Sequence, residues 1–487
     1  MRTLPDWVAD AVFYQIYPDR FARSARVPKP SRLEAWDSPP TRHGYKGGDL
    51  LGVVEHLDWL VDLGVTAVYL NPIFQSASNH RYHAYDYRHV DPMLGGDEAF
   101  DALIAAAHQR GIRVILDGVF NHTGRGFFPF HDVLENGADS PYLDWFTVYG
   151  TPINAYDLSR PPDYEAWWRL HALPKLNTAN PAVREFLMGV AEHWIGRGAD
   201  GWRLDVPEEI RTPGFWEEFR CRVRAVNPEA YLVGEIWHAA PEWTVGGTRF
   251  DGVMNYVLTE AVLRFAAAGR IDPGVAAPVN LTLQPLLDGA GYRAAIERLL
   301  AIYPEPARLG NLNLLGSHDT PRVLSMAGED RATVILAAAL LFTFSGPPCI
   351  YYGDEVGMRG HHDPGARGGF PWERPDSWDR EILQALRSLA AVRHGHPALR
   401  RGTYRHLGAA GSLYAFAREH GGECLVAAVN AGEAGADLVV AAPGDAPAEP
   451  ERVWGIGEAI VLQGRLELHV PARQAGIWAI PSASTSS

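Results

Sequence analysis

The feature that most constrains the fold is an alternation of short apolar segments with longer helical patterns over about the first 390 residues. Helical stretches such as 97–110 and 181–197 separate these segments; the first ends at Gly111 and the second begins with Pro181. Strands that alternate with helices pair in parallel, and eight of them predict an α/β fold, a (β/α)8 TIM barrel. The expected strands are residues 12–16, 66–70, 113–116, 201–204, 231–234, 252–255, 311–315 and 349–352.

Two stretches depart from this alternation. Residues 121–180 are rich in Gly, Pro and aromatic residues and are too long for a plain loop, which predicts an inserted B subdomain after strand 3. Beyond about residue 400, short alternating segments predict a C-terminal antiparallel β domain at 401–482, and the tail 482–487 is expected to fray. The barrel then comprises 1–120 and 181–400. The expected C-terminal strands are 412–418, 424–430, 436–441, 460–462 and 465–470.

Charge and composition exclude several functions. The 487 residues include 44 basic and 58 acidic side chains, a net charge of −14, so no nucleic-acid partner is expected. Residues 332–352 carry no charge, but Gly346 and two prolines interrupt them, which indicates a core helix, a turn and a buried strand and no membrane span. Three cysteines form no disulfide framework and no signal peptide is visible, so we expect a cytoplasmic protein.

Polar side chains follow four of the expected strands. A lone acid after a strand is more often a helix cap or a turn residue, but the carboxyl ends of barrel strands meet at one face, so four such groups indicate a site. Carboxylates without Cys/His metal spacing point to proton and nucleophile chemistry on a neutral, hydroxyl-rich substrate, as in glycoside cleavage. The four groups are Asp117 with Asn121 and His122, Arg203 with Asp205, Glu235 with Trp237, and His318 with Asp319.

Glycoside cleavage needs one ionised carboxylate and one protonated acid. Arg203 lies two residues before Asp205 on one strand, so both side chains point to the same face. A permanent cation there favours ionised Asp205 as the nucleophile. Glu235 needs a raised pKa to stay protonated, and we expect the charges of Asp205 and Asp319 to raise it.

In this order, the four segments resemble the α-amylase superfamily of retaining glycoside hydrolases. Leu173-Pro-Lys-Leu-Asn177 is similar to the signature of its neopullulanase, cyclomaltodextrinase and maltogenic amylase subgroup, and residues 7–21 and 47–50 resemble the start of the family's barrel. The resemblance implies cleavage of α-glucosidic bonds in maltooligosaccharides, cyclomaltodextrins or related short α-glucans through a covalent glucosyl-enzyme intermediate, with no cofactor.

The resemblance also implies a role for each site residue. Asp205 is the nucleophile, Glu235 the general acid/base and Asp319 the transition-state stabiliser. Arg203, His122 and His318 would bind the sugar in subsite −1, on the donor side of the scissile bond, with Asp117 and Asn121 as support, Tyr82 as its stacking ring, Trp237 on the acceptor side and Asp363 with Arg367 on the donor side.

Other functions stay open. A transglycosylase or glucan-isomerising enzyme uses the same intermediate, and nothing in the motifs decides between water and a sugar as acceptor. A catalytically inactive sugar-binding module is the alternative from another class, and the presence of Asp205, Glu235 and Asp319 argues against it.

Several side chains also have a purely structural interpretation. By residue type alone, His122 and His318 could be core histidines or metal ligands, and Trp237 could pack against the barrel rim. The aromatic group of Tyr164, Trp167 and Trp168 fits subdomain core and substrate surface equally well.

The chain departs from the subgroup at three places. Relatives usually carry a β domain before the barrel that helps to build a dimer, whereas here the barrel begins about ten residues after Met1, so a homodimer stays an open expectation. Residues 20–28, where many relatives have a calcium loop, are basic, and His361-His362 lacks a third ligand, so no metal is expected. His83 follows Tyr82, where relatives commonly have Asp.

Overall fold

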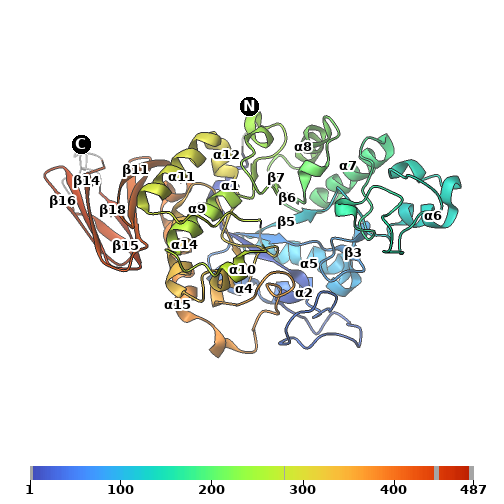
Figure 1. Ribbon diagram of the computed structural model, residues 1–487, viewed down its shortest axis with the longest axis horizontal. Helices are drawn as coiled ribbons and strands as arrows, with labels where there is room; N and C mark the ends of the chain where they lie inside the picture. Colours follow the sequence, from blue (N-terminus) through green and yellow to red (C-terminus); the bar gives the residue numbers. More distant parts are fainter. Residues whose placement is uncertain (1–3, 279, 444–448, 482–487) are drawn as a thin grey trace.

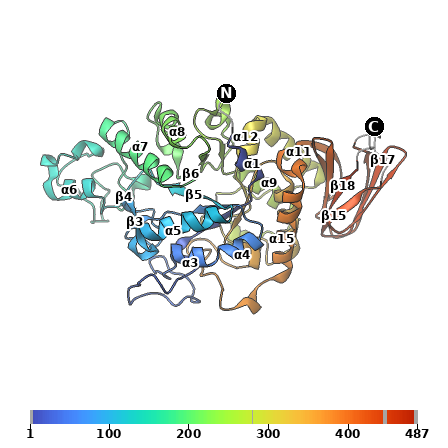
Figure 2. The same ribbon diagram turned by 180° about the vertical axis from the view of Figure 1, so that it is seen from behind.

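A computed structural model describes residues 4–278, 280–443 and 449–481. The molecule is elongated, with the barrel in the middle, the C-terminal strands at one end and the region of α6 (Phe128–Asn136) at the other (Figures 1 and 2). The tail 482–487, which was expected to fray, lies outside the described residues.

The eight predicted strands form one parallel sheet in the order β8-β7-β6-β5-β2-β1-β10-β9. A parallel bridge from Met254 to Leu312 joins its two ends, so the sheet closes into the predicted barrel. The strands are β1 (Phe13–Ile16), β2 (Ala67–Leu70), β5 (Arg113–Gly118), β6 (Gly201–Leu204), β7 (Tyr231–Gly234), β8 (Gly252–Val253), β9 (Asn313–Leu314) and β10 (Pro348–Tyr351).

Barrel strands are buried on both faces, which explains their continuous apolar runs. Every residue of β1, β2, β6, β7 and β10 is buried. Because the strands run in parallel, the residues that follow their carboxyl ends gather at one mouth of the barrel.

Helices surround the strands. Asn180 caps α7, its side chain accepting a bond from the Ala182 amide at 2.8 Å, and Pro181 occupies the first turn as predicted. Only two short 3-10 turns connect β7 to β8, at Pro241–Trp243 and Val245–Gly247. The outer α-helices are α1 (Asp6–Asp10), α2 (Pro18–Phe21), α3 (Leu50–Glu55), α4 (Leu57–Asp62), α5 (Gly96–Gln109), α7 (Pro181–Gly196), α8 (Phe215–Val226), α9 (Tyr256–Ala266), α10 (Pro273–Ala276), α11 (Gly289–Ile302), α12 (Glu305–Gly310), α13 (Val323–Met326), α14 (Arg331–Thr343), α15 (Arg380–Gly395) and α16 (Pro397–Arg401).

The uncharged run 332–352 forms α14 and β10, the predicted core helix and buried strand. In the described part of the chain, no helix has both the length and the apolar character that a membrane crossing requires.

Two inserted segments shape the barrel mouth. A hairpin of β3 (Phe74–Ser76) and β4 (Ala84–Val90) carries Tyr82 between its strands. The sequence prediction did not include this hairpin, because its irregular register breaks the alternation. Between β5 and α7, the chain forms α6 and several 3-10 turns, including η4 (Trp167–Arg169). Tyr164 is buried there against Phe130, with ring centroids 4.9 Å apart.

The C-terminal part has two antiparallel sheets, ordered β11-β12-β13-β18-β15 and β14-β17-β16. All five predicted segments are strands, but β11, β15 and β18 were missed. β11 is mostly half-buried and does not alternate, whereas β18 is buried on both faces. The strands are β11 (Thr403–Ala410), β12 (Leu413–His420), β13 (Glu423–Asn430), β14 (Ala436–Ala441), β15 (Glu451–Gly455), β16 (Glu458–Leu462), β17 (Arg465–Val470) and β18 (Gln474–Ile480).

Candidate active site

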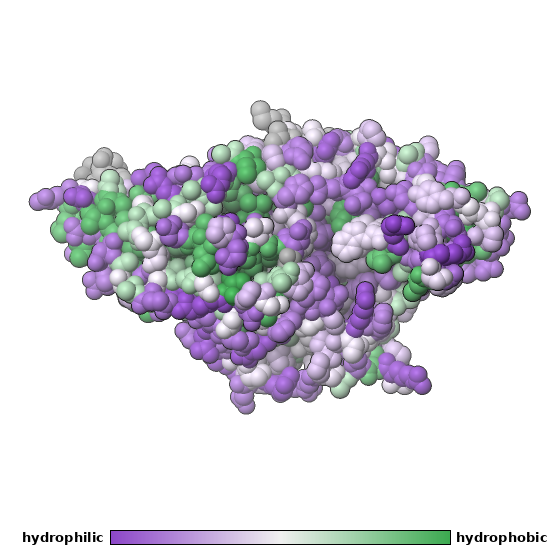
Figure 3. All heavy atoms as spheres, in the orientation of Figure 1, coloured by the Kyte–Doolittle hydropathy of each residue, from purple (hydrophilic) through white to green (hydrophobic). Residues whose placement is uncertain are grey.

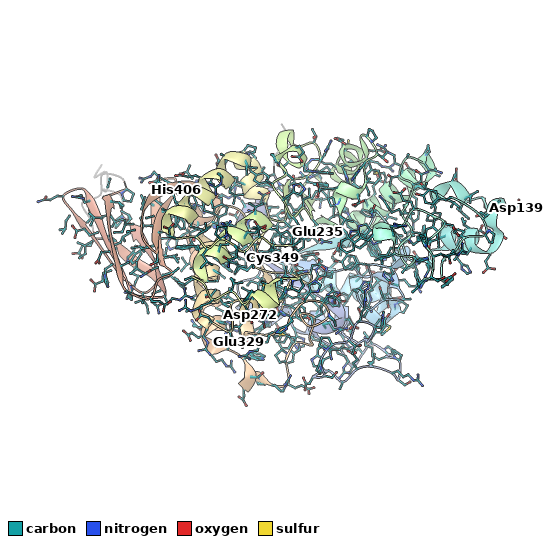
Figure 4. The ribbon with its side chains drawn as sticks, viewed as in Figure 1. Asp139, Glu235, Asp272, Glu329, Cys349 and His406 are labelled. Atoms are coloured by element: carbon teal, nitrogen blue, oxygen red, sulfur yellow. The ribbon has the colours of Figure 1, made fainter. Side chains whose placement is uncertain are left out.

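Arg203 is the electrostatic centre of the site. Its buried guanidinium forms ion pairs with Asp117 at 2.8 Å, Asp205 at 3.0 Å and Glu235 at 2.9 Å. β5, β6 and β7 are neighbours in the barrel, so these three carboxylates converge although they are far apart in sequence. Figure 4 labels Glu235 near the middle of the molecule.

Burial controls the protonation of the two predicted catalytic carboxyls. It is the largest cause that raises the pKa of Asp205 and of Glu235, and Arg203 lowers both. The charge of Glu235 raises the pKa of Asp205 further, and that of Asp319 raises the pKa of Glu235. The pair therefore retains a proton more strongly than free carboxyls do.

This electrostatic arrangement corrects two details of the sequence prediction. Arg203 contacts Glu235 as closely as Asp205, so its charge does not select Asp205 as the ionised partner. Burial, and not the neighbouring carboxylates, is the main cause of the raised pKa of Glu235.

Hydrogen bonds distinguish the two carboxyls. The Val206 amide donates to Oε2 of Glu235 at 3.1 Å and the Trp237 indole donates to Oε1 at 3.2 Å, so both oxygens of Glu235 are held. Oδ2 of Asp205 is buried and has no hydrogen-bond partner within the described residues. Asp205 therefore presents an uncommitted oxygen, as a nucleophile requires.

Tyr82 and His318 link the site to Asp117. The Tyr82 hydroxyl donates to Oδ2 of Asp117 at 2.7 Å and lies 2.7 Å from Nε2 of His318, and the two rings are parallel at 5.5 Å. Gln15 donates to Nδ1 of His318 at 2.9 Å, so Nε2 carries the hydrogen toward Tyr82. Burial lowers the pKa of His318 well below its ordinary value, which keeps the ring neutral.

Asp319 is held by Arg367, one of the two predicted donor-side residues. Arg367 contacts Asp319 at 3.2 Å with one terminal nitrogen and Asp363 at 3.1 Å with the other. Its Nε donates to the carbonyl of His318 at 2.9 Å. The guanidinium therefore bridges the segment after β9 and the loop after β10.

His122 is the second buried histidine of the site. Burial lowers its pKa to about 3, so the ring is neutral, and its buried Nε2 has no hydrogen-bond partner in the part of the chain that the structure describes. Asn121 is buried beside it, with Nδ2 3.2 Å from Nδ1 of His122. Trp167, which the sequence did not assign, stacks on the His122 ring at 5.0 Å.

Trp237 is partly covered. Its ring stacks on Tyr256 with centroids 3.7 Å apart and an interplanar angle of 4°, so one face is in contact with the barrel interior.

His83 packs edge-on against His80 at 4.8 Å, and burial lowers its pKa to about 4. The ring of His83 is therefore neutral near pH 7.

Sequence reasoning missed three polar side chains of the network. Tyr69 donates to Asp117 at 2.9 Å, and Asn71 donates to the Tyr82 hydroxyl at 3.0 Å. Asn71 directly follows β2, so the strand-end rule would have found it had it been applied there. Gln15 is the one polar residue of the buried strand β1, which was the available signal.

The described residues contain no cluster of three or more His, Cys, Asp or Glu side chains that could hold a metal ion. In the basic segment, Arg20 is buried and contacts Asp19 at 2.6 Å. A parallel barrel with three carboxylates around one arginine at its strand ends is typical of enzymes that perform acid–base and nucleophilic chemistry.

Comparison with known proteins specifies that class. Residues 15–387 match the family model described as alpha amylase, catalytic domain. The chain is 41% identical over 438 residues to a cyclomaltodextrinase of Geobacillus thermopakistaniensis, covering 89% of this chain and 71% of the relative. It is 42% identical over 421 residues to neopullulanase 2 of Thermoactinomyces vulgaris, covering 85% and 68%.

Among solved structures, the native form of a debranching enzyme from Nostoc punctiforme superposes with a TM-score of 0.91 at 50% identity, covering 98% of this chain and 99% of that one. The chain belongs to the α-amylase family of glycoside hydrolases.

Proposed function

We propose that this protein is a retaining hydrolase of α-glucosidic bonds in maltooligosaccharides, cyclomaltodextrins or related short α-glucans. Asp205 serves as nucleophile, Glu235 as general acid/base and Asp319 as transition-state stabiliser. The observation that carries the proposal is the shared guanidinium of Arg203, which holds Asp205 and Glu235 at one point of the barrel mouth.

The reaction follows from these positions. Oδ2 of Asp205 attacks the anomeric carbon while Glu235 gives its proton to the departing glycosidic oxygen, which yields a glucosyl ester and a free sugar end. Glu235, now ionised, takes a proton from water as the water attacks the same carbon and releases Asp205. Two displacements return the α configuration, and we expect a carboxyl separation of about 5–5.5 Å.

The remaining predicted residues bind the sugar. His122, His318 and Arg203 hydrogen-bond its hydroxyls, and Tyr82 stacks on it. Asp117 positions Tyr82 and Arg203 through its bonds to them. We place Trp237 beside the acceptor, and Asp363 with Arg367 beside the donor hydroxyls.

The experiment compares wild type with Asp205→Asn on maltotriose, γ-cyclodextrin and pullulan, following products and their first anomeric form by NMR. We expect α-anomers from the wild type and a loss of at least about 10³-fold in kcat for Asp205→Asn. Asp62→Asn on the exposed surface of α4 is the matched control and should cleave like wild type. Equal cleavage by Asp205→Asn would show that the nucleophile is wrong, and initial β-anomers would exclude retention.

Transfer to a sugar acceptor is the second candidate activity, because the same ester intermediate reacts with either acceptor. For assembly we propose at most a homodimer, as the resemblance allows, which sedimentation velocity distinguishes from a monomer. We also propose a cytoplasmic location, supported by only three cysteines in 487 residues.

A further inference from the structure

Three aromatic rings form a ladder that rises from the catalytic pocket to the surface. Trp167 lies parallel to His122, with centroids 5.0 Å apart and planes 11° apart, and Trp168 lies on Trp167 at 4.5 Å and 14°. Burial falls along the ladder: His122 is buried, Trp167 is half-buried and Trp168 is 76% exposed. The space-filling view shows a hollow between the barrel and the end of the molecule that carries α6 (Figure 3).

Trp168 has a defined position although it is exposed. Its backbone is left-handed, with φ 48° and ψ 24°, a conformation that bulky side chains rarely adopt, and Arg169 beside it has φ 59°. One face of the Trp168 indole lies on Trp167, so the opposite face is open to solvent. A strained backbone that holds a large apolar ring in water is typical of a binding surface.

A chain of contacts links the ladder to the segment that carries Trp237. His238, next to Trp237, pairs with Glu208 at 2.9 Å, and the adjoining Glu209 pairs with Lys175 at 3.3 Å. Lys175 forms a backbone bridge with His122, the foot of the ladder. Arg367, which contacts Asp319 and Asp363, takes no part in this chain of contacts.

We propose that Trp168 is a stacking platform for a glucosyl unit of the acceptor-side chain, beyond the units next to the scissile bond. The pyranose face carries apolar C–H groups that pack on an indole, as apolar groups pack on aromatic rings elsewhere. The ligand class is a linear α-glucan long enough to reach from the carboxylates to the outer rung. This inference rests on the proposed function for its substrate.

The test measures how the effect of Trp168→Ala depends on chain length. We expect its kcat/KM for maltoheptaose to fall about 3- to 10-fold more than its kcat/KM for maltotriose. Trp168→Phe should restore most of the difference. The matched control is Phe128→Ala, since Phe128 is a 63% exposed aromatic of the same inserted segment, and we expect equal activity at both lengths.

Binding separates the platform from the chemistry. In the Asp205→Asn background, calorimetry should show that Trp168→Ala weakens maltoheptaose binding about 3- to 10-fold. Trp168-dependent binding without cleavage by the wild type would uphold the platform and overturn the proposed hydrolase. Cleavage with an equal loss at both lengths, or with no loss, would overturn the platform and leave the hydrolase standing. No binding of either sugar would overturn both.

Discussion

At the scale of single residues, the site brings several charged side chains together and removes them from water. Arg203 compensates Asp117, Asp205 and Glu235 at once, and all four side chains are buried. Burial raises the pKa of Glu235, so its acid form persists to higher pH than that of a free glutamate. The strand-end positions of the acids and of Arg203 were predictable from sequence. That all three acids share Arg203 was not, because this depends on contacts across neighbouring strands.

The raised pKa of Glu235 predicts the alkaline side of the pH profile. The acid must be protonated to act, so kcat/KM of the wild type should decline as the pH rises through its raised pKa. Glu235→Gln should lower kcat on maltotriose by about 10²- to 10⁴-fold. With α-maltosyl fluoride, whose leaving group needs no proton, fluoride release should persist in Glu235→Gln without that alkaline decline. An unchanged alkaline decline in the variant would assign it to another group.

At the scale of secondary-structure elements, one buried side chain of α15 binds three other segments of the barrel. Arg393 donates to the carbonyls of Phe342 and Gly346 at the two ends of the turn between α14 and β10, and to that of Ala9 in α1. Burial, together with the nearby charges of Arg418 and Arg400, lowers its pKa to about 9. In the structure, Arg393 is buried on α15 together with Ile382, Leu386 and Leu389, and the sequence analysis did not single it out.

Arg393→Met should therefore destabilise the protein, because it leaves several buried carbonyls without a donor. We expect a loss of about 3 kcal/mol in the free energy of unfolding, measured by urea denaturation, with little change in activity per folded molecule. Arg380→Met, at the exposed start of α15, should cost less than about 0.5 kcal/mol. An equal effect of the two substitutions would exclude this stabilising role of Arg393.

At the scale of the whole molecule, the barrel and the inner face of the first C-terminal sheet share one core. Tyr414, Phe416 and Ile477 belong to the same buried cluster as the barrel helices. The second sheet packs on the other face of the first through a separate cluster that includes Leu466, Leu468 and Trp478. The alternating segments predicted a β domain here, and its union with the barrel core is a property of the tertiary structure.

A shared core predicts joint unfolding. Phe416 is 1% exposed and lies parallel to Tyr404 at 4.5 Å, so Phe416→Ala should cost about 4 kcal/mol. Within each protein, wild type or variant, circular dichroism and residual activity should report one and the same urea midpoint, and the midpoint of the variant should lie below that of wild type. Val439→Ala, on the exposed face of β14, should leave the midpoint near that of wild type. Early loss of the sheet signal with activity retained would show that the two parts unfold independently.

The sequence by itself determined the barrel, its eight strands and the order of the catalytic motifs. These depend on local patterns: apolar runs set the strands, and parallel pairing brings Asp117, Asp205 and Glu235 to one mouth. The exact limits of the inserted segment at 121–180 stay a proposal. Only the tertiary structure decided that Arg203 pairs with three carboxylates at once and that Tyr256 covers one face of Trp237. It also decided that Trp167 and Trp168 stack in line with His122 and reach the surface. Each of these depends on distances between residues remote in the chain, and a one-dimensional pattern carries no such distances.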